Sequence, residues 1–252
     1  MIHSKGDRIF NLVSHLIMIV FALMAVIPMI LLLTSSLTDN NMLIANGYTF
    51  FPKKVTLENY TYIFTNSNKV IRAYGVSALL TVCGTSLGIA ITLLIGYGLS
   101  RPGLPGRGFL VIFVVITMLF NGGLVPTYIN YTNVFHVKNT FWGLLIPSLL
   151  TNGFYVMLVK SYFTTSVPNE ILEAAEIDGT GEVGKFFWIS APMALPILAT
   201  VGLFIGIGYW NDWNNGYIYI STNTDLYSIQ NLLNRMQLNL EFLMQNAQTI
   251  NA

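Results

Sequence analysis

The chain has 252 residues, of which 54% are hydrophobic and 9% carry a charged side chain, whereas a soluble domain has about 25% charged residues. Twelve Lys and Arg against eleven Asp and Glu leave a formal net charge of +1, so no basic surface points to nucleic acid. One cysteine, Cys83, and three scattered His exclude a disulfide framework and give no metal-ligand cluster. We therefore expect a membrane protein without a metal site.

Five long runs without a formal charge indicate where the chain crosses a bilayer. They contain 21 to 30 residues each, and a helix needs about 20 mostly apolar residues to span the hydrocarbon core. We predict an all-α polytopic bundle that forms a single transmembrane domain over 1–252. The predicted spans are 12–33, 75–99, 109–129, 141–160 and 193–210.

Small residues mark a packing face on the second span. Gly84, Gly88, Thr92 and Gly96 recur at intervals of four, which places them on one side of a helix and lets a neighbouring backbone approach closely. We therefore expect a helix contact there. In the third span, Asn121-Gly122-Gly123 interrupts an otherwise apolar helix.

A polar segment at 161–192 separates the fourth and fifth spans and holds five of the eleven acidic residues. Pro168 suits the first turn of a helix, Glu170 suits its positive N-terminal dipole, and Gly179 can take the left-handed conformation that ends it. The pattern predicts a short amphipathic helix, followed by a second short helix that ends near Pro192.

Residues in this segment follow a restrictive spacing. Glu173-Ala174-Ala175 is followed after three residues by Gly179 and after nine more by Ile189, with Pro192 at the end. This spacing resembles the "EAA" loop of the permease subunits of binding-protein-dependent ABC importers. The family pattern ends in Ile-x-Leu-Pro, and Ala191 here replaces the Leu, which weakens packing under the second helix.

Other segments resemble the carbohydrate branch of that family, which includes the maltose-type permease. The resemblance covers nearly the whole chain, but the family continues into a further spanning helix where this sequence stops at Ala252. We therefore expect a sixth span to be absent from this chain. The similar segments are Phe51-Pro52-Lys53, Thr56-Leu57-Glu58-Asn59-Tyr60, Tyr97-Gly98-Leu99-Ser100-Arg101 and Tyr209-Trp210-Asn211-Asp212-Trp213.

The resemblance implies a membrane permease subunit of an ATP-driven importer of sugars or oligosaccharides in the bacterial inner membrane. Its partners would be a dimer of cytosolic ABC ATPases, a second and different permease, and an extracellular or periplasmic solute-binding protein. The chain would be no enzyme and would hold no cofactor, and it has no Gly-x-x-x-x-Gly-Lys-Ser/Thr loop for ATP. The loop 161–192 would enter a cleft of the ATPase through Glu173, Ala174, Ala175, Asp178, Gly179 and Pro192.

A substrate path is predicted beside the break in the third span and the end of the fifth span. Aromatic rings cover the apolar face of a sugar ring, amide groups satisfy its hydroxyls, and an uncharged cargo explains why the spans carry no charge. The predicted residues are Asn121, Tyr209, Trp210, Asn211 and Trp213. Alternatively, the aromatic residues form an interfacial belt, and Asp212 is a helix-terminal group in water.

The topology follows from placing the coupling loop in the cytosol. The N-terminus, 101–107 and 161–192 would then lie inside, and 34–74, 130–140 and the tail from 211 outside. Three alternatives remain open. They are an ABC importer for a peptide, phosphonate or metal, an ion channel or proton-coupled carrier, and a structural membrane subunit that passes no cargo.

Overall fold

A computed structural model describes residues 5–66, 68–147 and 150–250. The described residues are helical, apart from loops and one isolated β-bridge between Thr38 and Val55. They form two compact units, Met1–Asn68 and Lys69–Ala252, and each is described by itself. The sequence predicts one membrane domain, which stays a prediction.

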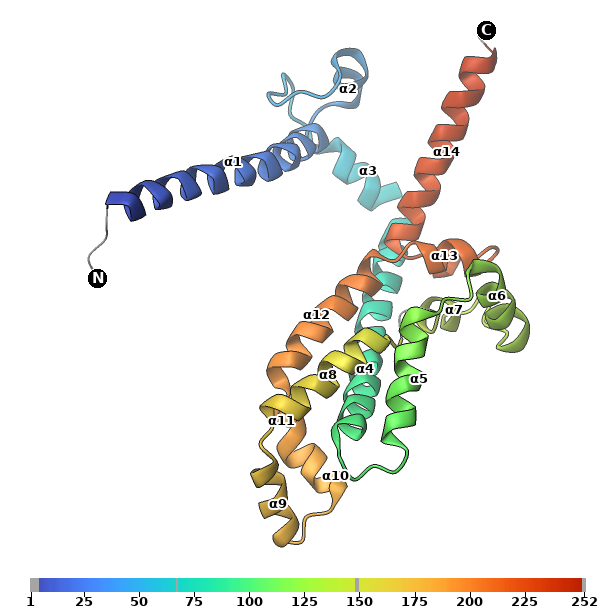
Figure 1. The fold of residues 1–252 in the computed structure, drawn as a ribbon. Coiled ribbons are helices and arrows are strands. Elements are labelled where there is room, and N and C mark those ends of the chain that lie inside the picture. The colour runs from blue at the N-terminus through green and yellow to red at the C-terminus, as the bar shows by residue number, and fades with distance from the viewer. Residues whose placement is uncertain (1–4, 67, 148–149, 251–252) are drawn as a thin grey trace. The chain divides into compact units, whose positions relative to one another are not determined.

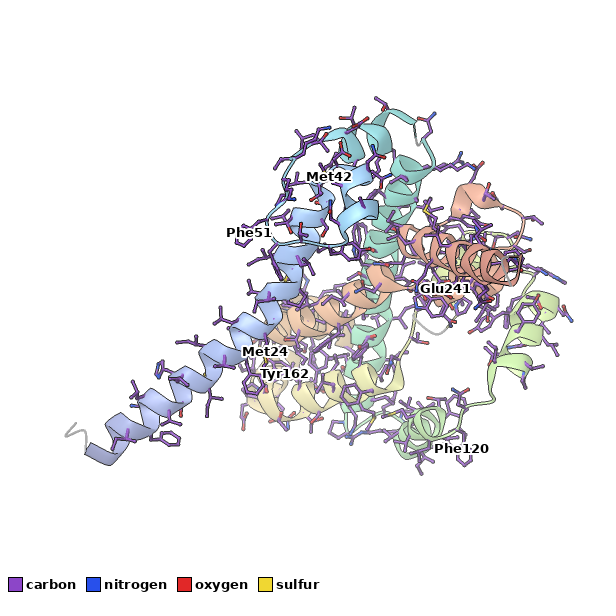
Figure 2. The ribbon with its side chains drawn as sticks, turned by 90° about the horizontal axis from the view of Figure 1, so that it is seen from above. Met24, Met42, Phe51, Phe120, Tyr162 and Glu241 are labelled. Atoms are coloured by element: carbon purple, nitrogen blue, oxygen red, sulfur yellow. The ribbon has the colours of Figure 1, made fainter. Side chains whose placement is uncertain are left out.

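The first unit consists of a long apolar helix and a folded segment at its end. Helix α1 (Lys5–Ser36) exposes apolar side chains along its length, such as Met24 in Figure 2, as expected for a helix that lies in lipid or against another chain. Asn59 Nδ2 donates to the carbonyls of Ser36 and Thr38 and so holds the returning chain on the end of α1. The short helices are α2 (Asn40–Asn46) and α3 (Glu58–Asn66).

The second unit is a helical bundle built on α4 (Asn68–Ser100), with α8 (Gly153–Ser166) and α12 (Leu195–Asn211) packed on it (Figure 1). The remaining helices of the unit connect these three or follow them in the chain. These are α5 (Arg107–Leu119), α6 (Leu124–Ile129), the π-helix η1 (Asn130–Val134), α7 (Trp142–Leu145), α9 (Asn169–Ile177), α10 (Glu182–Gly184), the π-helix η2 (Lys185–Ser190), α11 (Ala191–Met193), α13 (Asn214–Tyr219), the 3₁₀-helix η3 (Thr224–Leu226) and α14 (Ile229–Ile250).

The predicted small-residue face of α4 is confirmed as a helix contact. Gly84, Gly88, Thr92 and Gly96 are all buried. A Cβ atom on Gly88 would lie 3.3 Å from the side chain of Ile205 in α12, and one on Gly96 would lie 2.7 Å from Val159 in α8. Larger residues on this face would therefore push both helices away from α4.

The predicted spans correspond to different kinds of helix in the structure. Only α1 and α4 are long and apolar enough to cross a membrane as single helices among the described residues, and two bent pairs bring the candidates to four at most. The pair around 120–123 bends by 115°, at the predicted break in the third span. The five-span count stays a prediction.

The prediction of one continuous helix over 141–160 is wrong. Helix α7 ends at Leu145, and α8 begins only at Gly153. Pro147 cannot donate a backbone hydrogen bond to a continuing helix, and the Asn152 side chain accepts from the Phe154 amide as the cap of a new one. The described residues between Leu145 and Gly153 therefore separate two helices within this run.

Loops lie alternately at the two ends of the second unit (Figure 1). At one end, Arg101, just after α4, lies 3.4 Å from the carboxylate of Glu182 in α10. At the other end, Asn139 Oδ1 accepts from the backbone amides of Ser221 and Thr222 at 2.8 and 3.0 Å. The loop after α4 thus shares one end with 167–194, and the loop before α7 shares the other with the chain after α12.

Candidate functional site

The first candidate site is α9, which carries most of the loop pattern read in the sequence. Pro168 precedes its first residue in an extended conformation, and Glu170 lies in the first turn. The helix ends in a Schellman motif, in which the Gly179 amide donates to Glu176 and the Thr180 amide to Ala175. Gly179 has φ +81°, so the predicted left-handed turn is confirmed.

The two faces of α9 differ in exposure. Leu172 and Ala175 are buried at 4% and 9% exposure, because residues three apart share one side of a helix. Glu173 and Ala174 are exposed, as are Asp178 and Gly179. The surface that α9 leaves open in this chain therefore includes Ala174, whereas Ala175 faces the bundle. The predicted contact of these residues with an ATPase stays a prediction.

Pro192 lies outside α9, in α11, and is exposed. The helix that follows α9 runs from Glu182 to Met193 through the π-helix η2, where the sequence predicts a second short helix. The structure therefore places Pro192 at the far end of that helix, close to the 76° bend into α12.

An ion cluster joins α9 to the helix that follows it. Lys185 Nζ donates to Glu176 Oε2 at 2.7 Å and to Glu182 Oε1 at 3.1 Å. The hydrogen bond to Glu176 is the main cause that raises the pKa of Lys185. Burial acts to raise the pKa of Glu182, but hydrogen bonds from Lys185 and Tyr97 outweigh it and the pKa is lowered. Both shifts favour the charged forms of Lys185 and Glu182.

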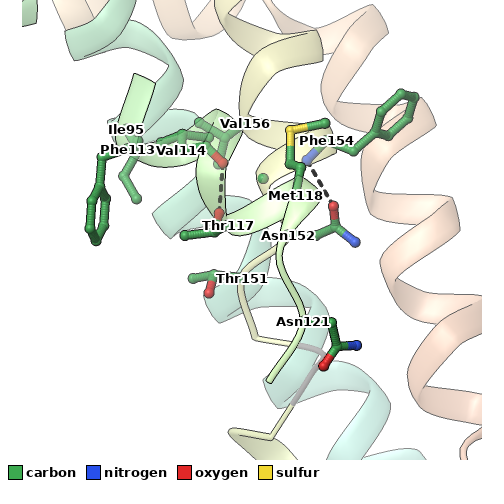
Figure 3. Close-up of a pocket in the computed structure, with 11 residues that line it drawn as sticks. Ile95, Phe113, Val114, Thr117, Met118, Asn121, Thr151, Asn152, Phe154 and Val156 are labelled. Carbon is green, nitrogen blue, oxygen red and sulfur yellow. Dashed lines mark hydrogen bonds between the residues drawn. The ribbon is translucent and has the colours of Figure 1, made fainter. Parts of the chain in front are cut away.

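The second candidate site is a cavity of about 650 Å³ between α4, α5 and α8 (Figure 3). Asn121 and Asn152 line it together with hydroxyl and aromatic side chains, and its lining residues carry no formal charge. The side-chain oxygens of the two Asn accept from the Gly123 and Phe154 amides. Among the described residues neither amide NH₂ group has an acceptor, so both are donors for a polar ligand. The remaining lining residues are Ile95, Phe113, Val114, Thr117, Met118, Thr151, Gly153, Phe154 and Val156.

The structure does not bring the predicted path residues together in one cavity. Trp210 and Asn211 line a separate groove of about 510 Å³ with residues of α4. Tyr209 is fully buried, and its hydroxyl donates to the Leu145 carbonyl at 2.8 Å, so it packs the bundle in this conformation. Trp213 lies beyond α12 and its ring contacts Tyr217.

Asp212 serves as a helix-terminal group, one of the two alternatives open from the sequence. Its Oδ1 accepts from the backbone amides of Asn214 and Asn215 at the start of α13, at 3.0 and 3.2 Å. Burial raises its pKa, which disfavours the carboxylate that would coordinate a hydroxyl-rich cargo.

Sequence reasoning missed Asn152, Thr117 and Thr151. The signal for Thr151 and Asn152 was the group Thr151-Asn152-Gly153, in which an Asn before an apolar run is typical of a helix start. No such signal marks Thr117. A helix that begins inside a predicted span is a mark of ligand sites in membrane transporters, because its unpaired amides need partners. The run was read as continuous because it carries no charge.

Comparison with known proteins relates this architecture to transporters. No family model matches the chain. The polygalacturonan/rhamnogalacturonan transport system permease protein YtcP of Bacillus subtilis (strain 168) is 32% identical over 230 residues, which cover 91% of this chain and 79% of YtcP. The chain belongs to the carbohydrate ABC transporter permease family. It is a permease subunit, and such subunits are membrane proteins and not themselves enzymes.

Two further relatives of this permease agree with that membership. Protein LplC of Bacillus subtilis (strain 168) is 30% identical over 248 residues, covering 98% of this permease and 82% of LplC. The crystal structure of a bacterial ABC transporter involved in the import of the acidic polysaccharide alginate matches with a TM-score of 0.86 and 25% identity. The match covers 98% of this permease and 88% of the chain in that structure.

Proposed function

We propose that this permease forms half of the translocation path of a bacterial inner-membrane importer for oligosaccharides, in a heterodimer with a different permease. A solute-binding protein delivers the sugar from outside, and a dimer of cytosolic ATPases binds and hydrolyses the ATP. The observation that supports this most strongly is α9, a short helix closed by Gly179 and carried at one end of the helical bundle.

Glu173, Ala174, Asp178 and Gly179 form the surface of α9 that contacts the ATPase. Their exposure supports this role, because a side chain must be accessible to enter a cleft on a partner. Ala175 contributes indirectly, because together with Leu172 it packs α9 against the bundle. Pro192 acts at the other end of the following helix, where a bend transmits movement of the loop to α12.

The proposed topology places the N-terminus and the loops 101–107 and 161–192 in the cytosol. It is supported by the ion pair of Arg101 with Glu182, which requires these two loops to share one side. The hydrogen bond from the Ser221 amide to Asn139 likewise supports one common side for 130–140 and the tail from 211, which the proposed topology takes to be the outside together with 34–74. The proposed five crossings count the bent pair of α5 and α6 as one crossing. They count the interrupted segment of α7 and α8 as another.

The cargo that suits this subunit is an uncharged part of an oligosaccharide. The cavity beside Asn121 and Asn152 offers amide donors, hydroxyl groups and the rings of Phe113 and Phe154, which match sugar hydroxyls and apolar sugar faces. An acidic sugar is the second candidate, because YtcP and the alginate transporter are named for acidic polysaccharides. In that case the carboxylate contacts the partner permease.

Uptake by the complete transporter in proteoliposomes tests both points. The sugar panel contains uncharged malto- and arabino-oligosaccharides and acidic galacturonate and alginate oligomers, with a peptide mixture as the non-sugar control. We expect uptake of an uncharged member that requires ATP and the binding protein. Uptake of peptide but of no sugar contradicts the proposed cargo class, and ATP-independent uptake contradicts the proposed coupling.

A further inference from the structure

A buried lysine occupies the region between the coupling helix and the bundle. The side chain of Lys185 is 3% exposed, whereas those of its partners Glu176 and Glu182 are 70% and 58% exposed. Taking an ammonium group out of water is unfavourable unless carboxylates replace the water. Lys185 therefore depends on Glu176 of α9 and Glu182 of α10 being held in place.

The same cluster reaches the end of the longest helix in the second unit. Glu182 uses Oε1 for Lys185, while its Oε2 accepts from the Tyr97 hydroxyl at 3.0 Å and lies 3.4 Å from Arg101 Nε. Tyr97 and Arg101 belong to the final turn of α4 and the residue that follows it. Glu182 is thus the point at which charges from the loop meet α4.

Aromatic packing fixes the position of Tyr97 within this cluster. Its ring lies 5.6 Å from that of Phe163 in α8 and 5.0 Å from that of Phe186 in η2. Edge-to-face and tilted pairs at these centroid distances are favourable. The Tyr97 hydroxyl is therefore presented to Glu182 by a rigid setting, and a shift of α10 would break the hydrogen bond.

A packing role alone would not need a charge at this position. A hydrophobic residue of similar size fills a buried site at less cost than an ammonium group, and such replacements are often neutral or stabilising. Lys185 is also too buried to meet an acidic residue of a partner protein. What the charge adds is a fixed relative position of three segments, because Lys185 binds the carboxylates of Glu176 and Glu182 together, and Glu182 also contacts the end of α4.

We propose that Lys185 is a positioning residue that makes α9, the helix from Glu182 to Met193 and the cytosolic end of α4 move as one body. When an ATPase displaces α9, Glu176 transmits the displacement to Lys185, and Glu182 transmits it to α4. This inference rests on the proposed coupling role of α9 and adds the connection from α9 to the helices of the path.

The test measures sugar uptake and ATP hydrolysis on the same proteoliposomes, with the panel sugar that the wild-type transporter imports. Lys185→Met keeps the length of the side chain and removes the charge. We expect the ratio of sugar imported to ATP hydrolysed to fall on the order of tenfold, with ATPase assembly retained. Lys185→Arg should restore most of the ratio. Lys160→Met, at a lysine outside the cluster, should leave it unchanged.

A second variant keeps the proposal testable if Lys185→Met does not fold. Tyr97→Phe retains the ring between Phe163 and Phe186 and deletes only the hydroxyl that donates to Glu182. It should lower the ratio in the same direction by a smaller factor. A folded Lys185→Met or Tyr97→Phe transporter with the wild-type ratio overturns the proposal, and so does a parallel loss of uptake and hydrolysis at constant ratio. If the wild-type transporter itself hydrolyses ATP but imports no sugar, the result instead contradicts the proposed function.

Discussion

The ring of Tyr209 occupies the space in which Gly84 would carry a side chain. A Cβ atom built on Gly84 would overlap the Tyr209 ring, and the Tyr209 hydroxyl is tied to the Leu145 carbonyl. Two residues 125 positions apart in the sequence thereby set how closely α4 and α12 approach. This contact explains why α4 has a Gly at a position where Ala would favour the helix.

The first prediction concerns the stability of this contact. Gly84→Ala should destabilise the purified permease by about 1–3 kcal/mol, because the ring cannot move without losing its hydrogen bond. Gly98→Ala is the matched control in the same helix, since a Cβ there would meet nothing within 4 Å. It should stabilise by about 0.5–1 kcal/mol. Thermal unfolding in detergent checks both, and equal midpoints for the two variants would contradict the contact.

The second prediction concerns the turn after the coupling helix. Gly179→Val should uncouple transport from ATP hydrolysis while membrane insertion persists, because a β-branched residue resists φ +81°. Gly181→Val is the matched control, since Gly181 has φ −71° and ψ 170°, a region that Val prefers. Uptake and hydrolysis are measured together, and normal uptake by Gly179→Val would remove the support for the coupling assignment.

The third prediction concerns the cavity in Figure 3. Asn152→Ser keeps an oxygen that can cap α8 but removes the amide NH₂ group. Loss of one hydrogen bond to an uncharged cargo should raise the KM for sugar uptake about fivefold. Asn214→Ser, at an exposed residue of α13, should not change the KM. An unchanged KM in both variants would show that cargo does not contact Asn152.

The fourth prediction concerns the groove that Trp210 and Asn211 line. Trp210→Ala and Asn211→Ala should each change the affinity or selectivity of uptake if cargo passes there, whereas belt residues should alter only insertion or stability. Tyr209→Phe should instead reduce stability by about 1 kcal/mol without affecting the KM, because it removes a buried hydrogen bond. Unchanged import kinetics in both Ala variants would exclude the groove from the path.

The fifth prediction is a pH dependence in the first unit. The hydrogen bond from Lys54 Nζ to Asp39 Oδ2, at 2.7 Å, is the main cause that lowers the pKa of Asp39 from its ordinary value of 3.8. Because the folded pKa lies below the unfolded one, the stabilisation is complete above pH 3.8 and disappears as the pH falls through the folded value.

Hydrogen exchange of the α2 backbone amides measures this loss of stabilisation, because Asp39 also accepts a hydrogen bond from the Asn41 amide at the start of the helix. Lys54→Met should speed exchange at neutral pH and weaken its dependence on acid. Lys53→Met, at the neighbouring exposed lysine, should behave as the wild type. Identical exchange in the two variants would mean that the ion pair does not order this segment.

Part of the architecture was readable from residue spacing. Small residues spaced four positions apart around Gly88 predict a packed helix face, because helix geometry is local. A residue without a side chain lets any neighbouring helix approach closely. The turn at Gly179 was also predictable from the sequence, because the left-handed conformation that ends α9 depends on the absence of a Cβ atom at that residue. The membership in a permease family also followed from sequence, through the spacing from Glu173 to Pro192.

Other features were decided only by the tertiary structure. The meeting of Asn121 and Asn152 at one cavity was hidden, because the two residues belong to different predicted spans. The ion cluster around Lys185 was also invisible in the sequence, since Tyr97 and Arg101 of α4 are brought to Glu182 by packing between segments far apart in the chain. The sequence by itself therefore determined the membrane character, the small-residue face and the coupling turn. The fold determined which polar groups meet, because such meetings depend on contacts between distant segments rather than on neighbours in the chain.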